Sequence, residues 1–218
     1  MRNLKDSPKF NEFLNKLRKV LAEPLPGVIA QSKMAPPHRP TQLSNNVSSE
    51  LIRDSAVLIL LWLEENQIFT VFILRPEYEG IHSNQIGFPG GKYEKSDVDF
   101  VATALREAQE EVGIIPESIT ILGQLTPLFI HPSRFMVYPI VGFTKTSPTF
   151  ILDPVEIKKV IPCNIFDFLK PARKVIQDID VRGNIISGIP CFKIEENLIW
   201  GATAMIFNEL LEIIKTID

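Results

Sequence analysis

The sequence predicts an α+β fold in which a mixed β-sheet lies between α-helices. The chain runs through an amphipathic segment, apolar strand-like runs, a second amphipathic segment, further strand-like runs and a last amphipathic segment. The strand-like runs form hairpin pairs and do not alternate regularly with helices, which indicates a mixed sheet. At 218 residues the chain is long enough to bury a substantial core. We expect residues 1–50 to form an N-terminal helix and connector packed on a single domain, residues 51–218.

The two ends of the chain have the pattern of amphipathic helices. Apolar side chains recur at helical spacing in residues 7–22 and again in residues 200–217. The lysines and arginines of the first segment leave a membrane-surface role open, but its apolar stripe suits docking on its own domain better. Residues 28–50 hold three prolines among polar residues, so we expect an extended connector there.

Short apolar runs mark the strands. Residues 56–63 are continuously apolar. Residues 68–74 are apolar except for Thr70 and follow after a polar turn, so the two runs predict a buried hairpin. Residues 153–160 alternate only weakly, and residues 164–169 suit a short helix. Four further strands are expected, at residues 119–129, 136–143, 174–181 and 190–194.

Composition excludes several classes of protein. The net charge of −3 provides no basic field for nonspecific binding to nucleic acid. Two cysteines do not make a disulfide framework, so free thiols in a reducing compartment are expected. The first ten residues lack an apolar signal core, and the longest apolar run, of about eight residues, is too short to span a membrane. We therefore expect a cytoplasmic protein that binds neither nucleic acid nor a membrane.

The candidate chemistry lies in residues 90–114. On a helix over residues 100–112, Glu107, Glu110 and Glu111 share an arc of about 100°, while a neighbouring arc is apolar. Carboxylates near a helix C-terminus oppose the macrodipole, and like charges four residues apart repel. A solvated acidic face and a cation site are both open on this pattern alone. Gly90 and the residue after it permit close approach by a ligand, and Gly113 suits the helix cap.

The full pattern resembles the Nudix hydrolases, whose box reads G-x5-E-x7-R-E-U-x-E-E-x-G-U, with U aliphatic. Residues 106–114 match its second half, with Ala108 at the first U position. In the first half, Gly91 is followed after five residues by Asp97, where the box has Glu. Eight residues instead of seven then separate Asp97 from Arg106, which is one insertion relative to the general box.

The same insertion resembles one branch of that family, the coenzyme A pyrophosphatases. Their upstream segment looks like L-L-T-x-R-S-x3-R-x3-G-x3-F-P-G-G, and residues 72–91 follow it in register. Arg75 lies thirteen residues before Phe88, as the pattern requires. Two positions depart from it, because Gly80 stands where the pattern has Arg and Asn84 where it has Gly.

The resemblance implies a Nudix fold and a cofactor, Mg²⁺ or Mn²⁺. Glu107 and Glu111 would be the main metal ligands, with Glu110 completing the cluster and the carbonyl of Gly91 also in reach. One of the three glutamates would act as the general base. Arg106, grouped with these catalytic residues, would pair with Asp97 and so fix the loop to the helix. The glycines Gly90 and Gly113 would have structural roles.

The implied substrate is coenzyme A or a thioester derivative, cut to 3′,5′-ADP and a 4′-phosphopantetheine species. Cations for the 3′-phosphate and further substrate contacts would come from Arg75, Arg39, Arg134, Lys92 and His82. Each arginine is otherwise an ordinary surface charge, and His82 otherwise stabilises a loop. The alternatives are hydrolysis of ADP-ribose or a dinucleotide, or a noncatalytic binding module, although such a module is expected to lose box carboxylates. The sequence leaves a homodimer open.

Overall fold

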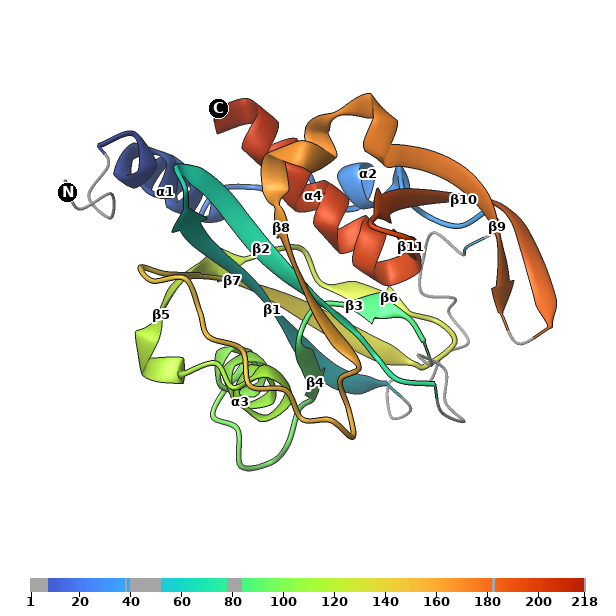
Figure 1. Ribbon diagram of the computed structural model, residues 1–218, viewed down its shortest axis with the longest axis horizontal. Coiled ribbons are helices and arrows are strands. Elements are labelled where there is room, and N and C mark those ends of the chain that lie inside the picture. The colour runs from blue at the N-terminus through green and yellow to red at the C-terminus, as the bar shows by residue number, and fades with distance from the viewer. Residues whose placement is uncertain (1–7, 38, 40–51, 78–83, 182, 218) are drawn as a thin grey trace.

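The computed structural model describes residues 8–37, 39, 52–77, 84–181 and 183–217, and it has the predicted α+β architecture (Figure 1). The helices are α1 (Pro8–Leu21), α2 (Gly27–Ser32), α3 (Phe100–Val112) and α4 (Gly201–Ile217). The strands are β1 (Arg53–Glu64), β2 (Gln67–Leu74), β3 (Ile86–Gly87), β4 (Gly90–Lys92), β5 (Ile119–Gln124), β6 (Leu128–Ile130), β7 (Phe135–Thr144), β8 (Lys159–Asn164), β9 (Lys174–Val181), β10 (Asn184–Ile194) and β11 (Asn197–Ile199). Short 3₁₀ turns lie at Pro116–Ser118, Ile165–Leu169 and Pro171–Arg173.

The mixed sheet is organised around β1. One edge of β1 pairs in parallel with β7 along residues 53–62. The other edge is shared by two antiparallel partners, because residues 61–64 pair with β2 and residues 55–57 pair with β4. This division places the short strand β4 directly beside the centre of the sheet. The predicted hairpin of β1 and β2 is confirmed.

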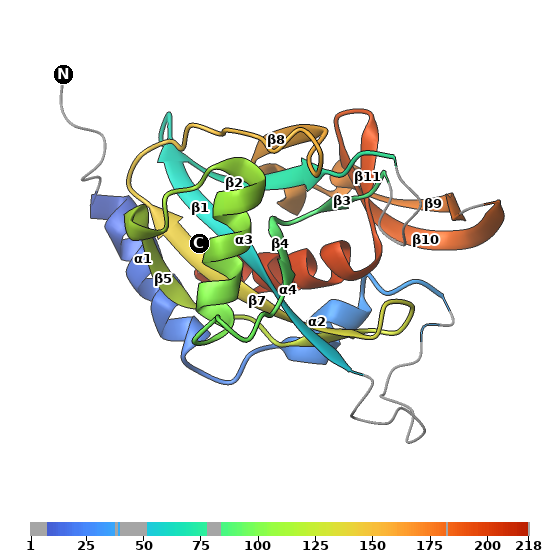
Figure 2. The same cartoon turned by 90° about the horizontal axis from the view of Figure 1, so that it is seen from below.

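Both faces of the sheet are covered, which explains why residues 56–63 of β1 are continuously apolar. Leu58, Leu60 and Trp62 belong to a core shared with α3. Ile59 and Leu61 alternate with them and belong to a second core, shared with α1 and α4. Figure 2 shows α3 on one side of the strands and α4 on the other.

Helix α3 has the boundaries that its sequence predicts. The side chain of Asp99 accepts a hydrogen bond from the Ala102 amide at 2.8 Å and so caps the N-terminus. Gly113 ends the helix in the left-handed conformation, with φ 71°. A Cβ on Gly113 would lie 2.8 Å from Ile151, so both conformation and space favour glycine.

Two expectations are wrong in detail, and the structure resolves a third segment whose sequence pattern was weak. The connector over residues 28–50 is not extended throughout, since its first residues form α2; residues 40–50 lie outside the described part of the chain. The strand expected at 119–129 is broken into β5 and β6, because Thr126 turns away and donates to Glu209 through both its amide and its hydroxyl. Residues 153–157 form a turn, in which the Ile157 amide donates to the Asp153 carbonyl at 2.8 Å.

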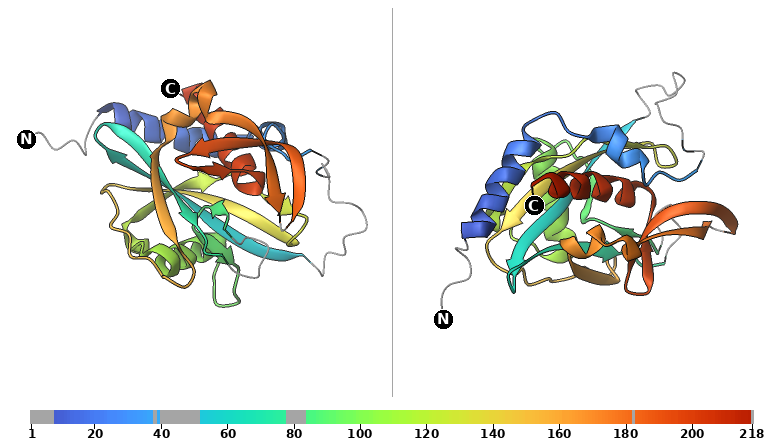
Figure 3. Two further views of the ribbon diagram at one scale, coloured as in Figure 1. Left: turned by 45° about the vertical axis from the view of Figure 1, so that its right-hand side comes forward. Right: turned by 90° about the horizontal axis from the view of Figure 1, so that it is seen from above.

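The late strands form a separate antiparallel sheet in the order β11–β10–β9. The apolar runs in the sequence predict β9 and the end of β10, whereas β11 was not predicted. Figure 3 shows the β9–β10 hairpin extending away from the main sheet. Within the described residues, no helix is both long enough and apolar enough to cross a membrane.

Candidate active site

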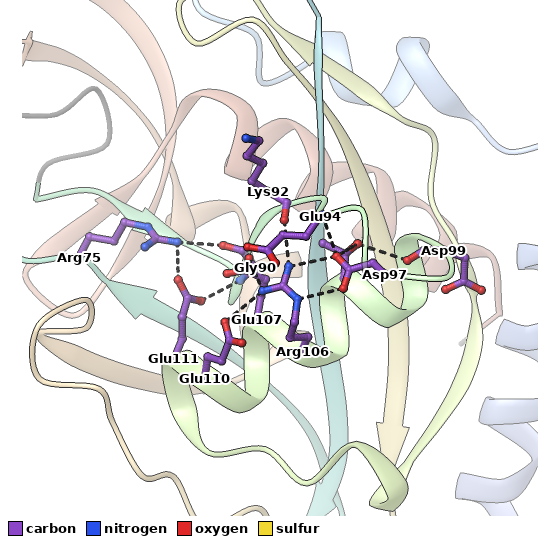
Figure 4. Close-up of polar contacts among 11 residues, drawn as sticks. Arg75, Gly90, Lys92, Glu94, Asp97, Asp99, Arg106, Glu107, Glu110 and Glu111 are labelled. Atoms are coloured by element: carbon purple, nitrogen blue, oxygen red, sulfur yellow. Dashed lines mark hydrogen bonds and ion pairs between the residues drawn. The ribbon is translucent and has the colours of Figure 1, made fainter.

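The candidate site lies where β4 meets α3 (Figure 4). A Cβ on Gly91 would lie 2.3 Å from Oε2 of Glu107, so the carboxylate rests against the glycine backbone. A Cβ on Gly90 would lie 2.3 Å from the Ala56 carbonyl oxygen, and Gly90 also has φ 151°. The Gly-Gly pair therefore lets β4 fit between β1 and the acidic face of α3.

Glu111 is the most enclosed carboxylate of this site, with a side chain 1% exposed. The Gly90 amide donates to its Oε2 at 2.8 Å. Nη2 of Arg75 donates to its Oε1 at 2.6 Å and also to the Gly90 carbonyl at 3.0 Å. Burial raises the pKa of Glu111 to about 7, although the charge of Arg75 acts in the opposite direction.

Glu107 and Glu110 are held by a second arginine. Nη1 of Arg106 donates to Oε1 of Glu107 at 2.9 Å and to Oε2 of Glu110 at 3.1 Å. The Glu107 side chain is 15% exposed, and burial raises its pKa. Glu110 is 59% exposed and faces solvent. The three glutamates thus have graded exposure, from enclosed to open.

The predicted ion pair between Arg106 and Asp97 is present. Nε of Arg106 lies 3.0 Å from Oδ1 of Asp97, and Nη2 lies 3.1 Å from Oδ2. Nη2 also donates to the Lys92 carbonyl at 3.0 Å, and Thr103 donates to Asp97 at 2.9 Å. The hydrogen bond from Arg106 is the main cause that lowers the pKa of Asp97 to about 2. Arg106 therefore ties β4, the following loop and α3 together.

The donor chemistry of the three glutamates fits a divalent cation, because carboxylate oxygens are the ligands that Mg²⁺ and Mn²⁺ prefer. Their arrangement is different from the predicted cluster. Among the described residues, no three acidic, histidine or cysteine side chains lie close enough together to hold one ion. In this arrangement Arg106 binds Glu107 and Glu110, while Arg75 binds Glu111.

The other predicted substrate-binding residues are dispersed. Arg75 lies in the site, as described above. Arg39 is half-buried and donates to the Phe129 carbonyl of β6, so its described contact is with main chain. Arg134 is exposed at the turn between β6 and β7, with φ 56°. His82 lies outside the described residues. The side chain of Lys92 points away from the three carboxylates in Figure 4.

The backbone conformation of Asn84 explains why asparagine can replace the glycine of the coenzyme A pattern at this position. Its φ is 53°, a left-handed conformation that glycine adopts freely and that asparagine tolerates better than most residues. Its amide donates to the Pro76 carbonyl at 3.1 Å. The exchange of Gly for Asn is therefore compatible with the same turn. The other departure, at residue 80, lies outside the described residues.

Two residues near the site were missed by the sequence analysis. Thr103 is fully buried and binds Asp97; its position three residues before Arg106 was the available signal. The charge of Glu156 raises the pKa of Glu107, although the two are far apart in the chain. Glu156 is brought near because the Asp153 amide donates to the Glu111 carbonyl at 3.0 Å.

Comparison with known proteins agrees with this geometry. A family model described as the NUDIX domain matches residues 52–177, which is more than half of the chain. The chain is 37% identical over 131 residues to the uncharacterized Nudix hydrolase NudL of Yersinia enterocolitica and 34% identical over 131 residues to that of Photorhabdus laumondii. These matches cover 60% of this chain and only 66% and 69% of the two relatives.

The fold is similar to that in a crystal structure of the M. smegmatis Nudix hydrolase RenU. The TM-score is 0.50 at 12% identity, and the similarity covers 76% of this chain and 88% of that one. At this identity the likeness concerns the fold alone. Hydrolases of this kind generally use a divalent metal ion. The matched domain and the relatives together show that the chain belongs to the Nudix hydrolase family, as its sequence predicted.

Proposed function

We propose that this protein hydrolyses the diphosphate bond of coenzyme A or of its thioester derivatives. The products would be 3′,5′-ADP and a 4′-phosphopantetheine species, and the ion would be Mg²⁺ or Mn²⁺. The observation that carries the hydrolase assignment is the packing of Glu107 and Glu111 against Gly90 and Gly91. This packing joins the two halves of the box around β4.

The residues have distinct roles in this proposal. Glu107 and Glu111 would hold the ion, with Glu110 and the carbonyl of Gly91 as further oxygen donors. A divalent ion supplies neutralisation of the phosphate oxygens and lowers the pKa of water. One of the three glutamates would accept the proton of the attacking water. Burial raises the pKa of Glu107, and it raises the pKa of Glu111 to about 7.

The choice of coenzyme A is supported by sequence features that surround the box. These are the Arg75-to-Gly91 segment and the extra residue between Asp97 and Arg106. We retain Arg39, Arg134 and His82 as candidates for substrate contacts, with residues 51–218 as the hydrolase domain and residues 1–50 as an accessory segment. The loss of the pattern's Arg at residue 80 favours a second candidate, hydrolysis of ADP-ribose or a dinucleotide.

A substrate panel tests the proposal. Coenzyme A, an acyl-coenzyme A, ADP-ribose and a dinucleotide are each incubated with enzyme and either Mg²⁺ or Mn²⁺, and kcat/KM is compared. We expect the highest value for coenzyme A or its acyl derivative. A higher kcat/KM for ADP-ribose would contradict the assignment of coenzyme A as the substrate but would leave the assignment as a hydrolase intact. Hydrolysis of no compound, with binding of one, would favour the noncatalytic module.

A further inference from the structure

Arg75 makes contacts that differ from those expected of a substrate-binding residue. Its Nη2 donates to Oε1 of Glu111 at 2.6 Å and to the Gly90 carbonyl at 3.0 Å. The Gly90 amide donates to the other oxygen of the same carboxylate at 2.8 Å. Arg75, Gly90 and Glu111 therefore form a closed ring of three hydrogen bonds, shown on the left of Figure 4. Both oxygens of Glu111 are fixed by this ring.

The backbone also holds Arg75 in this position. Its amide donates to the Gln85 carbonyl at 3.1 Å, immediately before β3. The segment 153–158 bridges α3 and β2 through main-chain hydrogen bonds. At one end the Asp153 amide donates to the Glu111 carbonyl of α3, and at the other the Lys158 amide donates to the Leu74 carbonyl of β2 at 2.9 Å. The end of β2 and the last turn of α3 are thus joined independently of the side chains.

Burial makes this contact important for Glu111. The carboxylate is 1% exposed, and a buried charge without a partner is strongly destabilising. The Arg75 side chain is 23% exposed, so most of it is buried as well. A guanidinium already bonded to a carboxylate and a carbonyl is poorly placed to serve as the main cation for a substrate phosphate.

We infer that Arg75 is a positioning residue that fixes the Glu111 carboxylate against Gly90, and that it does not bind the 3′-phosphate of the substrate. The inference rests on the proposed function, because Glu111 is there a functional carboxylate. In this role Arg75 orients both the Glu111 carboxylate and strand β4. Recognition of the 3′-phosphate is left to other cations.

The first test compares coenzyme A with dephospho-coenzyme A, which has the same diphosphate but no 3′-phosphate. In Arg75→Ala, a positioning role predicts the same loss for both substrates, about 10- to 100-fold and mainly in kcat. A contact with the 3′-phosphate predicts a rise in KM for coenzyme A alone. That second outcome would overturn the inference.

Two further variants separate positioning from general damage. Arg75→Lys keeps the charge and a nitrogen that can reach one acceptor, so it should recover part of the lost kcat. Arg173→Ala is the matched control, because Arg173 also contacts a carbonyl, that of Lys193 at 3.2 Å, and a carboxylate, that of Asp167 at 3.8 Å, but outside the site. Arg173→Ala should keep the wild-type kcat.

A double-variant cycle tests whether Arg75 acts through Glu111. If it does, adding Arg75→Ala to Glu111→Gln should lower kcat by less than threefold, because the positioned carboxylate is already gone. A further loss as large as that of Arg75→Ala in the wild type would show an independent role and overturn the inference.

Hydrogen exchange supplies a readout that does not depend on turnover. In Arg75→Ala, the amides of residues 86–92 should exchange faster than in the wild type, while those of α4 should be unchanged. Unchanged exchange in residues 86–92 would contradict the ring of contacts. If the wild type cleaves no diphosphate, the proposed function fails, but the exchange measurement still tests the position of Arg75.

Discussion

Two buried glutamates lie on opposite faces of the sheet and are held in different ways. Glu209, on α4, is fully buried and accepts hydrogen bonds from neutral donors: the Gly27 amide at 3.1 Å, Gln31 Nε2 at 2.9 Å and the Thr126 hydroxyl at 2.6 Å. Glu111, on α3, is 1% exposed and is held by the Arg75 guanidinium and the Gly90 amide. Burial is thus equal, but the partners differ.

Under the proposed function, the two carboxylates have different roles. The donors to Glu209 come from α2 and from the break between β5 and β6, so this side chain joins three segments of the fold. Glu111 lies one helical turn from Glu107 and next to Glu110 in sequence, so its surroundings contain further negative charge. Like charges and burial both oppose ionisation, which is an unfavourable arrangement for stability alone. We therefore propose a structural role for Glu209 and a chemical role for Glu111.

The largest expected effect is on turnover when the acidic face of α3 is altered. Glu107→Gln should lower kcat by at least about 10²-fold, because the amide neither binds a divalent ion as a carboxylate does nor accepts a proton. The circular dichroism spectrum should remain that of the wild type. Glu117→Gln, at an exposed glutamate just beyond α3, is the control and should keep its activity. Unchanged metal-dependent turnover in Glu107→Gln would contradict the functional role proposed for the acidic face of α3.

The next largest effect is on stability and concerns Glu209, on the face of the sheet that α4 covers. Glu209→Ala should lower the free energy of unfolding by roughly 3 kcal/mol, because buried donors lose their acceptor. Urea denaturation measures this loss, and kcat per folded molecule should stay at the wild-type value. Glu209→Gln keeps an acceptor oxygen and should lose less. A drop in kcat as large as that of Glu107→Gln would show that the two glutamates are not distinct in role.

The ion pair between Asp97 and Arg106 should affect the stability of the protein at acid pH. Asp97 has a pKa lowered to about 2, so its contribution to stability is present above pH 4 and is lost as the pH falls through about 2. This contribution is about 2 kcal/mol. Denaturant unfolding between pH 4 and pH 2 should show a smaller fall for Asp97→Asn than for the wild type. Glu212, whose pKa is also lowered to about 2, remains in both proteins. Equal falls would contradict the ion pair.

The smallest expected effect is on stability at the exposed end of the acidic face. Glu110 is 59% exposed, so Glu110→Gln should change the free energy of unfolding by less than about 0.5 kcal/mol. Thermal denaturation provides the measurement. A loss of stability comparable to that of Glu209→Ala would contradict the graded exposure of the three glutamates. The kcat of the same variant shows whether Glu110 takes part in turnover.

Local signals predicted much of the fold. The apolar arc of α3 and Gly113 together define a helix whose observed limits agree with the prediction, and the structure adds Asp99 as its N-cap. The run in β1 is apolar on both faces, which is how a strand covered on both sides reads in sequence. These features depend on neighbours within a few residues, so they are accessible without a structure.

Long-range contacts were not predictable in the same way. Helix α2 and the break at Thr126 both depend on Glu209, which lies more than eighty residues from either. The contact of Arg75 with Glu111 joins residues thirty-six positions apart, so the sequence suggested a phosphate ligand where the structure places an ion pair. The pairing of Asp97 with Arg106 was anticipated because family resemblance supplied the partner.

Product analysis with coenzyme A in ¹⁸O-labelled water tests the central claim most directly. Wild-type enzyme and Glu107→Gln are incubated with coenzyme A and Mg²⁺ or Mn²⁺, and the products are analysed by mass spectrometry. We predict that the wild type forms 3′,5′-ADP and 4′-phosphopantetheine. The label should appear either in the 5′-phosphate of 3′,5′-ADP or in the phosphate of 4′-phosphopantetheine. Glu107→Gln should form neither product above background. Intact coenzyme A in the wild-type reaction, or equal cleavage by both proteins, would contradict the account.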